Sequence, residues 1–150
     1  MEELAKIVRS YIEKNCKIYI FSQYISTAEL IERFLKEKLA LKPRDITLIT
    51  GLDEDQFLKL NGFKRAGLIL VSTPVFDKGT DIPEADVMIV HTPPLSIEKL
   101  FQVIGRIRGG DIVFLAYRGF EESIIEEVAE KLRKAFAEAR GESFGIDRHL

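Results

Sequence analysis

Two short stretches between residues 68 and 110 combine residue types that bind phosphate and sugar groups. In the first, Thr73 ends an apolar run and is followed by the segment KGTDIP at residues 78–83. A hydroxyl and a backbone N–H at the end of a strand can face a phosphate oxygen. Gly79 allows close backbone approach, and Asp81 can accept a hydrogen bond from a ribose hydroxyl or orient an arginine. The D-x-P pattern alone is typical of a surface turn, but directly after a buried strand it favours a ligand-binding loop.

The second stretch follows some twenty residues later and carries Gln102, Gly105, Arg106 and Arg108 in the sequence FQVIGRIRGG. The rigid fork of an arginine matches a phosphate, and an arginine inserted across a cleft can stabilise charge that develops on a γ-phosphate. Gly105 leaves room for close approach, and Gln102 can hold a water or a neighbouring lobe. Taken alone, this pattern fits equally well a helix that ends in solvated arginines and glycine caps.

The elements that must position these residues alternate regularly between strand and helix. Apolar runs predict strands over residues 17–21, 46–50, 67–72, 87–91 and 112–116. Helical spacing predicts helices over residues 2–14, 26–38, 53–63 and 121–139, and one that begins near Ser96. Ser26 and Glu29 have capping-box spacing, and Phe57, Leu60 and Phe63 are expected on one buried side. The pattern predicts an α/β fold with a parallel sheet covered by helices on both faces. In such sheets, binding residues gather after the carboxyl ends of the strands.

Composition is that of one globular domain. The chain has 150 residues, of which 46% are hydrophobic and 31% charged, and no apolar run reaches the ~20 residues that span a bilayer. The mixed-charge N-terminus is not a secretory signal, so we expect an intracellular protein with no membrane role. The net charge of −2 gives no overall basic surface for nucleic acid. Cys16 is expected to be structural, as is His91, and no role is assigned to His149. Abundant Glu, Lys, Arg and Ile are typical of a thermophile, and we expect an archaeal or thermophilic source.

The two stretches resemble motifs V and VI of superfamily 2 helicases, and the segment SQYIST at residues 22–27 resembles motif IV. The resemblance covers residues 17–125 and is closest in pattern to archaeal Hef and XPF/FANCM-type helicases. It implies that the fold is the second RecA-like lobe of the motor, a parallel β-sheet with helices on both faces. We expect this domain at residues 1–140, followed by a C-terminal tail at residues 141–150.

The resemblance also implies roles for individual residues. Three are expected to be catalytic: Gln102, Arg106 and Arg108. Three are expected to bind ATP: Gly79, Asp81 and Gly105. Five are expected to contact nucleic acid: Ser22, Gln23, Thr27, Thr73 and Lys78. The chain contains neither a G-x-x-x-x-G-K-[ST] phosphate loop nor the acidic box that holds a metal. ATP and Mg²⁺ are therefore expected only when the chain is paired with an N-terminal RecA-like lobe, and the isolated chain is expected to be inactive. The expected substrate is single-stranded or branched nucleic acid, in particular DNA.

Two positions depart from the helicase pattern Q-R-x-G-R-x-x-R. Val103 replaces the first arginine and Gly109 replaces the last, which is the usual arginine finger, while Arg108 stands one residue early. Either Arg108 reaches the position of the missing arginine finger, or the motor is impaired in ATP hydrolysis. A non-catalytic nucleic-acid-binding or interaction module derived from a helicase lobe is the alternative. An unrelated Rossmann-like nucleotide-binding enzyme is disfavoured, because no G-x-G-x-x-G follows the first strand.

Overall fold

The structure is a computed structural model that describes residues 1–73, 75, 84–91, 107–115, 130 and 146–149. Nine elements lie within these ranges. The helices are α1 (Glu2–Glu13), α2 (Ile25–Lys38) and α3 (Gln56–Ala66). The strands are β1 (Ile18–Phe21), β2 (Ile46–Ile49), β3 (Ile69–Ser72), β4 (Ala85–Val90), β5 (Ile107–Leu115) and β6 (Ile146–His149).

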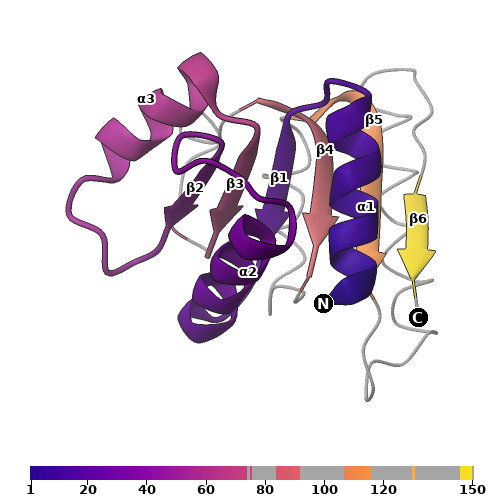
Figure 1. The fold of residues 1–150 in the computed structure, drawn as a ribbon, viewed down its shortest axis with the longest axis horizontal. Helices are drawn as coiled ribbons and strands as arrows, with labels where there is room; N and C mark the ends of the chain where they lie inside the picture. Colours follow the sequence, from indigo (N-terminus) through magenta and orange to yellow (C-terminus); the bar gives the residue numbers. More distant parts are fainter. Residues whose placement is uncertain (74, 76–83, 92–106, 116–129, 131–145, 150) are drawn as a thin grey trace.

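All recorded strand pairs are parallel, and the strands stand in the order β2-β3-β1-β4-β5-β6 (Figure 1). The chain runs from β1 out to β2 and then back to β3, which lies beside β1. Because parallel crossovers are right-handed, these opposite directions place α2 and α3 on opposite faces of the sheet. Helix α1 lies on the same face as α2 (Figure 1). The predicted α/β fold with a parallel sheet and helices on both faces is confirmed.

The core has two layers because alternate residues of each strand point to opposite faces. Ile18 and Ile20 of β1 pack with buried residues of α1 and α2 such as Val8 and Leu35. The residue between them, Tyr19, points to the other face and is equally buried. Burying one large apolar side chain contributes about 1.5–3 kcal/mol. This two-sided burial explains why the strands read as continuous apolar runs rather than as alternating ones.

Several local predictions differ from the structure. Tyr24, in extended backbone, occupies the N-cap position of α2 without a side-chain cap, and Ser26 lies inside the helix. The predicted capping box is therefore wrong. Phe57 is 74% exposed, whereas Leu60 and Phe63 are buried. Helix α3 begins only at Gln56, so Phe57 lies in a first turn that reaches beyond the buried stretch.

The end of the sheet that contains β5 and β6 also differs from the prediction. Strand β5 starts at Ile107, five residues before the predicted position, and its pairing with β4 shifts register between Ala85 and Val87. Ala85 pairs with Ile107, but Val87 pairs with Asp111, so β5 has extra residues between these two pairs. A bulge of this kind inserts residues into one strand without ending the pairing. In the segment expected to be a tail, Ile146–His149 form β6 beside β5. The helix predicted near Ser96 lies outside the described residues, as does most of the predicted closing helix. Within the described ranges, no helix combines the length and apolar content required to cross a bilayer.

Candidate functional site

Apart from two buried tyrosines, Tyr11 and Tyr19, the buried polar residues of the described chain gather at one edge of the sheet. They are Ser22, Thr50, Ser72, Thr73 and His91. Each of them ends its strand or directly follows it. Parallel strands finish on the same side, so these residues form a row that we call the carboxyl edge. Polar groups are buried only where a fold gives them partners or a ligand does, which makes the carboxyl edge the candidate site.

Backbone hydrogen bonds fix the order of residues along this edge. The Ser22 N–H donates to the carbonyl oxygen of Ser72 at 3.0 Å, and the Thr73 N–H donates to that of Ile49 at 3.2 Å. The His91 N–H donates to the carbonyl oxygen of Phe21 at 2.9 Å. The ends of β2, β3, β1 and β4 are thereby held in register, and Thr50, Thr73, Ser22 and His91 succeed one another along the edge.

Two buried hydroxyl groups, those of Tyr19 and Ser72, form a chain of hydrogen bonds that ends at the backbone of Thr73. The Tyr19 hydroxyl donates to Ser72 Oγ at 3.3 Å, and Ser72 Oγ donates to the carbonyl oxygen of Thr73 at 2.6 Å. Burial raises the pKa of Tyr19 far above its ordinary value, although the bond to Ser72 works against this shift. Tyr19 therefore stays neutral at physiological pH. Sequence reasoning missed this chain of hydrogen bonds; the only available signal was a tyrosine and a serine within otherwise apolar strands.

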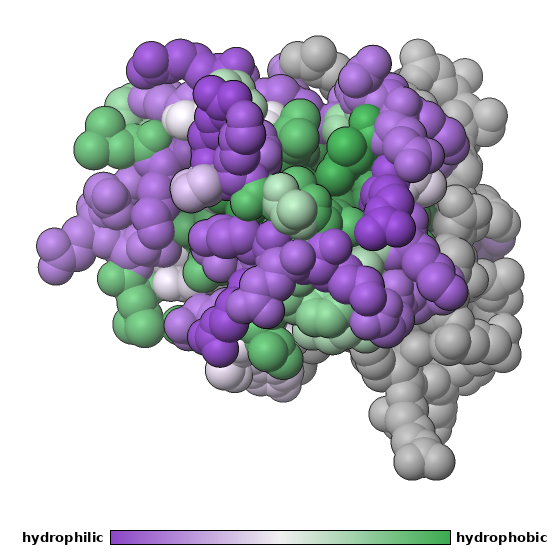
Figure 2. All heavy atoms as spheres, in the orientation of Figure 1, coloured by the Kyte–Doolittle hydropathy of each residue, from purple (hydrophilic) through white to green (hydrophobic). Residues whose placement is uncertain are grey.

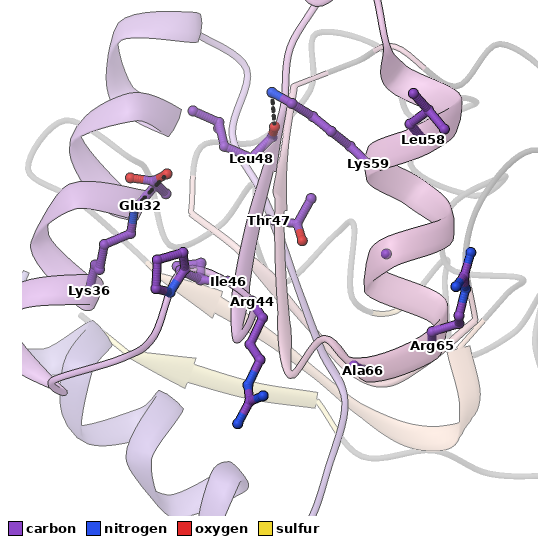
Figure 3. Close-up of a pocket in the computed structure, with 12 residues that line it drawn as sticks. Glu32, Lys36, Arg44, Ile46, Thr47, Leu48, Leu58, Lys59, Arg65 and Ala66 are labelled. Carbon is purple, nitrogen blue, oxygen red and sulfur yellow. Dashed lines mark hydrogen bonds and ion pairs between the residues drawn. The ribbon is translucent and has the colours of Figure 1, made fainter.

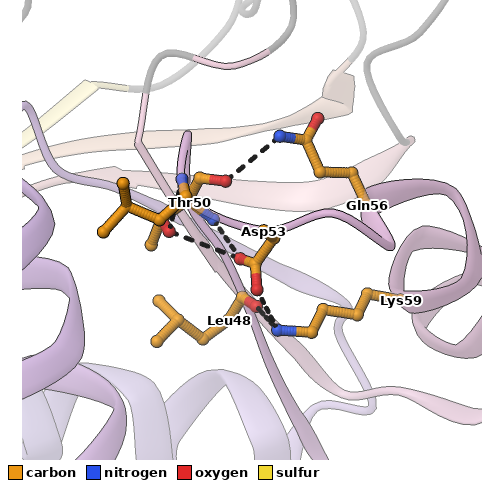
Figure 4. A network of polar contacts seen from close by, with 6 residues as sticks. Leu48, Thr50, Asp53, Gln56 and Lys59 are labelled. Carbon is orange, nitrogen blue, oxygen red and sulfur yellow. Dashed lines mark hydrogen bonds and ion pairs between the residues drawn. The ribbon is translucent and has the colours of Figure 1, made fainter.

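The loop between β2 and α3 is tied together by a second polar network (Figure 4). Asp53 Oδ2 accepts the Thr50 N–H at 2.7 Å, and Asp53 Oδ1 accepts Lys59 Nζ at 2.6 Å. Gln56 donates its side-chain amide to the carbonyl oxygen of Thr50 at 3.1 Å. Partial burial works to raise the pKa of Asp53, but the bonds from Lys59 and Thr50 together bring it below its ordinary value. Asp53 is a fixed carboxylate that shapes the loop, and sequence reasoning did not single it out.

His91 closes the row on the β4 side. Its side chain is buried, and burial lowers the pKa of His91 to about 4. At neutral pH the imidazole is uncharged, as a structural role requires. The described carboxyl edge therefore presents hydroxyls, backbone groups and a neutral imidazole, and its chemistry is that of hydrogen bonding rather than ionic attraction.

The predicted nucleic-acid residues lie partly on this edge. Thr73 and Ser22 are buried in the row, and Ser22 Oγ donates to the carbonyl oxygen of Tyr24 at 3.4 Å. Gln23 is half-buried beside Ser22, and Thr27 is half-buried in the first turn of α2. The structure thus brings Ser22, Gln23 and Thr73 together where β1 and β3 end.

The remaining predicted site residues cannot be placed. Lys78, Gly79, Asp81, Gln102, Gly105 and Arg106 lie outside the described residues, and Arg108 is described only as a backbone position in β5. Their roles stay predictions. In the part of the chain that the structure describes, no three His, Cys, Asp or Glu side chains come together in a way that could hold a metal ion.

The sequence matches the family model described as "Helicase conserved C-terminal domain" over residues 1–110. It is 29% identical over 142 residues to the ATP-dependent DNA helicase RecG of Aquifex aeolicus, which covers 89% of this chain and 18% of that protein. It is 27% identical over 151 residues to the ATP-dependent DNA helicase MPH1 of Coccidioides immitis, covering 91% of this chain and 14% of the relative. The chain therefore spans less than a fifth of the length of these relatives.

Solved structures give the same answer for the fold. The chain is similar to the Hef helicase domain of Pyrococcus furiosus, with 28% identity and a TM-score of 0.65 over 84% of this chain and 27% of that one. It also resembles domain 2 of the DEAD-box helicase Mss116p, solved bound to an RNA duplex, with a TM-score of 0.68 over 99% of this chain and 58% of that one. At 17% identity, the second likeness bears on the fold alone. The resemblance drawn from the sequence motifs is confirmed.

Proposed function

This chain belongs to the helicase conserved C-terminal domain family, and from that premise we propose that it is the second motor lobe of an ATP-dependent superfamily 2 helicase or translocase. In this proposal an N-terminal RecA-like lobe, in the same protein or another chain, supplies the phosphate loop. The two lobes close over ATP and move along single-stranded or branched nucleic acid, in particular DNA. The observation that carries the proposal is the carboxyl edge, where the buried polar groups of four parallel strands meet.

The carboxyl edge supplies neutral hydrogen-bond donors for a phosphate backbone. In the proposal, the Thr73 hydroxyl and the loop from Ser22 to Thr27 contact phosphate oxygens. Helix α2 begins there without a side-chain cap, so its first N–H groups and its dipole favour an anion. Such contacts position a strand without reading its sequence. Lys78 adds the charge that the described edge lacks.

The arginine segment is proposed to serve the ATP cleft between the lobes. Arg106 contacts the γ-phosphate, Arg108 replaces the finger that Gly109 lacks, and Gln102 holds a water or the other lobe. Gly79, Asp81 and Gly105 line the nucleotide. The carboxylates that hold Mg²⁺ in such motors belong to the phosphate-loop lobe, and the neutral donors of the carboxyl edge do not fit that metal. The intracellular location and thermophilic source expected from composition remain predictions.

Phosphate release tests the proposal at two levels. The isolated chain should hydrolyse no ATP, with or without DNA, because it has no phosphate loop. In a two-lobed protein, Arg106→Ala should abolish turnover, and Arg108→Ala should reduce it at least about tenfold with little loss of ATP affinity. Arg9→Ala, at an exposed position of α1, is the matched control. Turnover by the purified isolated chain that a Thr73 or Arg106 substitution removes would contradict the proposal.

A second function is favoured by one observation, the glycine at position 109 where the usual finger stands. A non-catalytic binding module derived from a helicase lobe needs no finger. Under the motor proposal, the isolated lobe binds single-stranded oligonucleotides weakly, with a dissociation constant no tighter than about 10⁻⁴–10⁻⁶ M, and binding falls steeply with salt. Fluorescence anisotropy across a salt series separates the two functions, since tight, salt-insensitive binding would favour the module.

A further inference from the structure

A groove of about 630 Å³ runs along the outer side of β2, between α2 and α3 (Figure 3). Within the described part of the sheet, β2 is a terminal strand. We call this feature the β2-edge groove and define it by six of its lining residues: Lys36, Arg44, Ile46, Leu48, Lys59 and Arg65. It lies to the side of the sheet and has a different composition from the carboxyl edge.

The floor of the groove is strand backbone. Asp45 and Ile49 turn their carbonyl oxygens toward β3, where they accept the N–H groups of Ile69 at 2.9 Å and Thr73 at 3.2 Å. Backbone groups of a strand alternate in direction, so those of Ile46 and Leu48 point out into the groove. An outward-facing row of this kind is a template for a further strand.

One of these outward groups already has a side-chain partner. Lys59 Nζ donates to the Leu48 carbonyl oxygen at 3.1 Å while it pairs with Asp53 at 2.6 Å. Lys59 belongs to α3 rather than to the strand, and its ammonium covers this one acceptor of the exposed edge. Among the described residues, no hydrogen bond is recorded for the N–H or carbonyl of Ile46 or for the N–H of Leu48, and these are the groups that an added strand would use.

The walls of the groove are cationic. Four of its lining residues are basic and one, Glu32, is acidic. Lys36 pairs with Glu32 at 3.5 Å, and Lys59 pairs with Asp53. Among the described residues, no ion pair is recorded for Arg44 or Arg65. Arg44 precedes β2 and Arg65 lies in the last turn of α3, so both arginines lie near the end of the groove where β2 begins (Figure 3).

An apolar side chain completes the lining. Leu58, also in the groove, is 70% exposed. Hydrophobic atoms come to the surface beside hydrophilic ones along the margin of the molecule where α3 and the loop before it lie (Figure 2). The groove thus combines backbone donors and acceptors, arginines, and a leucine, which is the set that an extended peptide needs.

We propose that the β2-edge groove binds an extended acidic peptide segment as an added strand. Its backbone pairs with Ile46 and the Leu48 N–H, its carboxylates meet Arg44 and Arg65, and an apolar side chain covers Leu58. Arginine pairs a carboxylate through two parallel hydrogen bonds, which adds geometric specificity. Main-chain pairing gives the affinity in this mode of recognition, and side chains give the selectivity. A nucleic-acid strand offers charge but has no peptide backbone to pair with Ile46, which is why a peptide is favoured.

The test uses the full chain and a fluorescein-labelled hexapeptide of sequence Glu-Glu-Val-Glu-Glu-Val, which as an extended strand presents both glutamate and valine on each of its two faces. Anisotropy measures affinity, and nuclear magnetic resonance follows the backbone amides of Ile46 and Leu48. We expect both amides to shift on titration. Arg44→Glu and Arg65→Glu should each weaken binding at least about fivefold, since each reverses one attractive charge. Arg9→Glu on α1 makes the same charge change at a remote exposed position and should alter affinity less than about twofold.

Two peptide variants separate strand addition from simple charge attraction. N-methylation of the backbone nitrogens along one side of the hexapeptide removes donors and should abolish the amide shifts. A lysine–valine hexapeptide should not bind. Unchanged binding by the methylated peptide, or equal binding by the lysine peptide, would overturn the proposal. It would also be overturned if a single-stranded oligonucleotide shifted the Ile46 and Leu48 amides and lost this effect in Arg44→Glu, because the groove would then be a nucleic-acid surface.

Discussion

The carboxyl edge and the β2-edge groove differ in burial and in charge. The carboxyl edge consists of buried, uncharged groups held by backbone bonds between neighbouring strands, as between Ser22 and Ser72. The groove consists of cations on flanking helices and loops, together with backbone that no described strand covers. The first is fixed by the topology of a parallel sheet, whereas the second depends on side chains that the fold does not require. A change at the carboxyl edge should therefore disturb the fold, and a change of a groove arginine should disturb binding alone.

Asp53 and Lys59 connect the two regions. Asp53 accepts the N–H of Thr50 on the carboxyl edge, and it also holds Lys59, which caps Leu48 in the groove. Substitutions elsewhere should affect one region only, whereas a substitution of Asp53 or Lys59 should affect both regions.

Acidification should lower the free energy of unfolding, because His91 on the carboxyl edge is buried in its uncharged form. The pKa of His91 is lowered to about 4 by burial, whereas a histidine in the unfolded chain titrates near 6.5. The unfolded state therefore binds more protons between these values, and stability falls as pH drops from about 6.5 to about 4. The loss should be on the order of 3 kcal/mol. Urea unfolding at a series of pH values measures it.

His91→Gln removes the titrating group and serves as the control. The slope of stability against pH in the same window should become markedly shallower. A variant that keeps the full slope would show that other groups cause the acid loss.

Asp53→Ala should cost about 2 kcal/mol of unfolding free energy, because it removes the partner of a partly buried backbone N–H and of Lys59. Urea unfolding gives this value, and the amide resonance of Leu48 reports the loss of the Lys59 cap. The neighbouring Asp55→Ala is the control, since Asp55 is exposed and makes no side-chain cap to α3. Equal losses in both variants would mean that the network does not hold the loop.

The groove should tolerate an added methyl group. Gly62 lines it within α3, and a Cβ at Gly62 would meet nothing within 4 Å. Gly62→Ala should therefore stabilise the chain by about 0.5–1 kcal/mol through helix propensity. Thermal unfolding measures the gain.

Gly67→Ala is the opposing case just beyond the same helix. A Cβ at Gly67 would lie 2.8 Å from the Cα of Phe63, so this variant should be destabilised. Destabilisation by both alanines would indicate that α3 is packed on its groove side as well.

The arginines of the groove should matter least for folding. Arg44→Gln and Arg65→Gln should each change stability by no more than about 0.5 kcal/mol, as expected for surface positions outside any network. Differential scanning calorimetry checks this. A loss above about 1 kcal/mol in either variant would assign the arginine to the fold rather than to binding.

The sequence predicts the framework well because parallel strands buried on both faces leave continuous apolar runs. The run from Ile18 to Phe21 and the helix from Glu2 to Glu13 were placed to within a residue or so. The S-x-x-E spacing at Ser26 misled, because the exit from β1 already sets Tyr24 in extended backbone before the helix starts. Helical spacing also could not show that α3 begins as late as Gln56, which leaves Phe57 exposed.

The candidate site was predictable only in part. Thr73 and Ser22 follow apolar runs, and the rule that parallel strands end together brings them to one edge. Asp53 and Lys59 gave no signal, because an Asp and a Lys six residues apart are ordinary surface residues until a loop folds them together. The β2-edge groove was invisible for another reason: strand order, and hence which strand is terminal, depends on pairings between distant segments.

The central place of β1 has a consequence for how the chain is made. Strand β1 ends at Phe21, and its two neighbours, β3 and β4, begin only at Ile69 and Ala85. Ribosomes add roughly 5–20 residues per second, so the apolar segment Ile18–Phe21 is synthesised about 2–10 seconds before its first neighbour exists. Helix formation takes only microseconds or less, so α1 and α2 are available to cover β1 during that wait. Nascent chains halted before Ile69 should therefore depend on these helices, or on a chaperone, to stay free of aggregation.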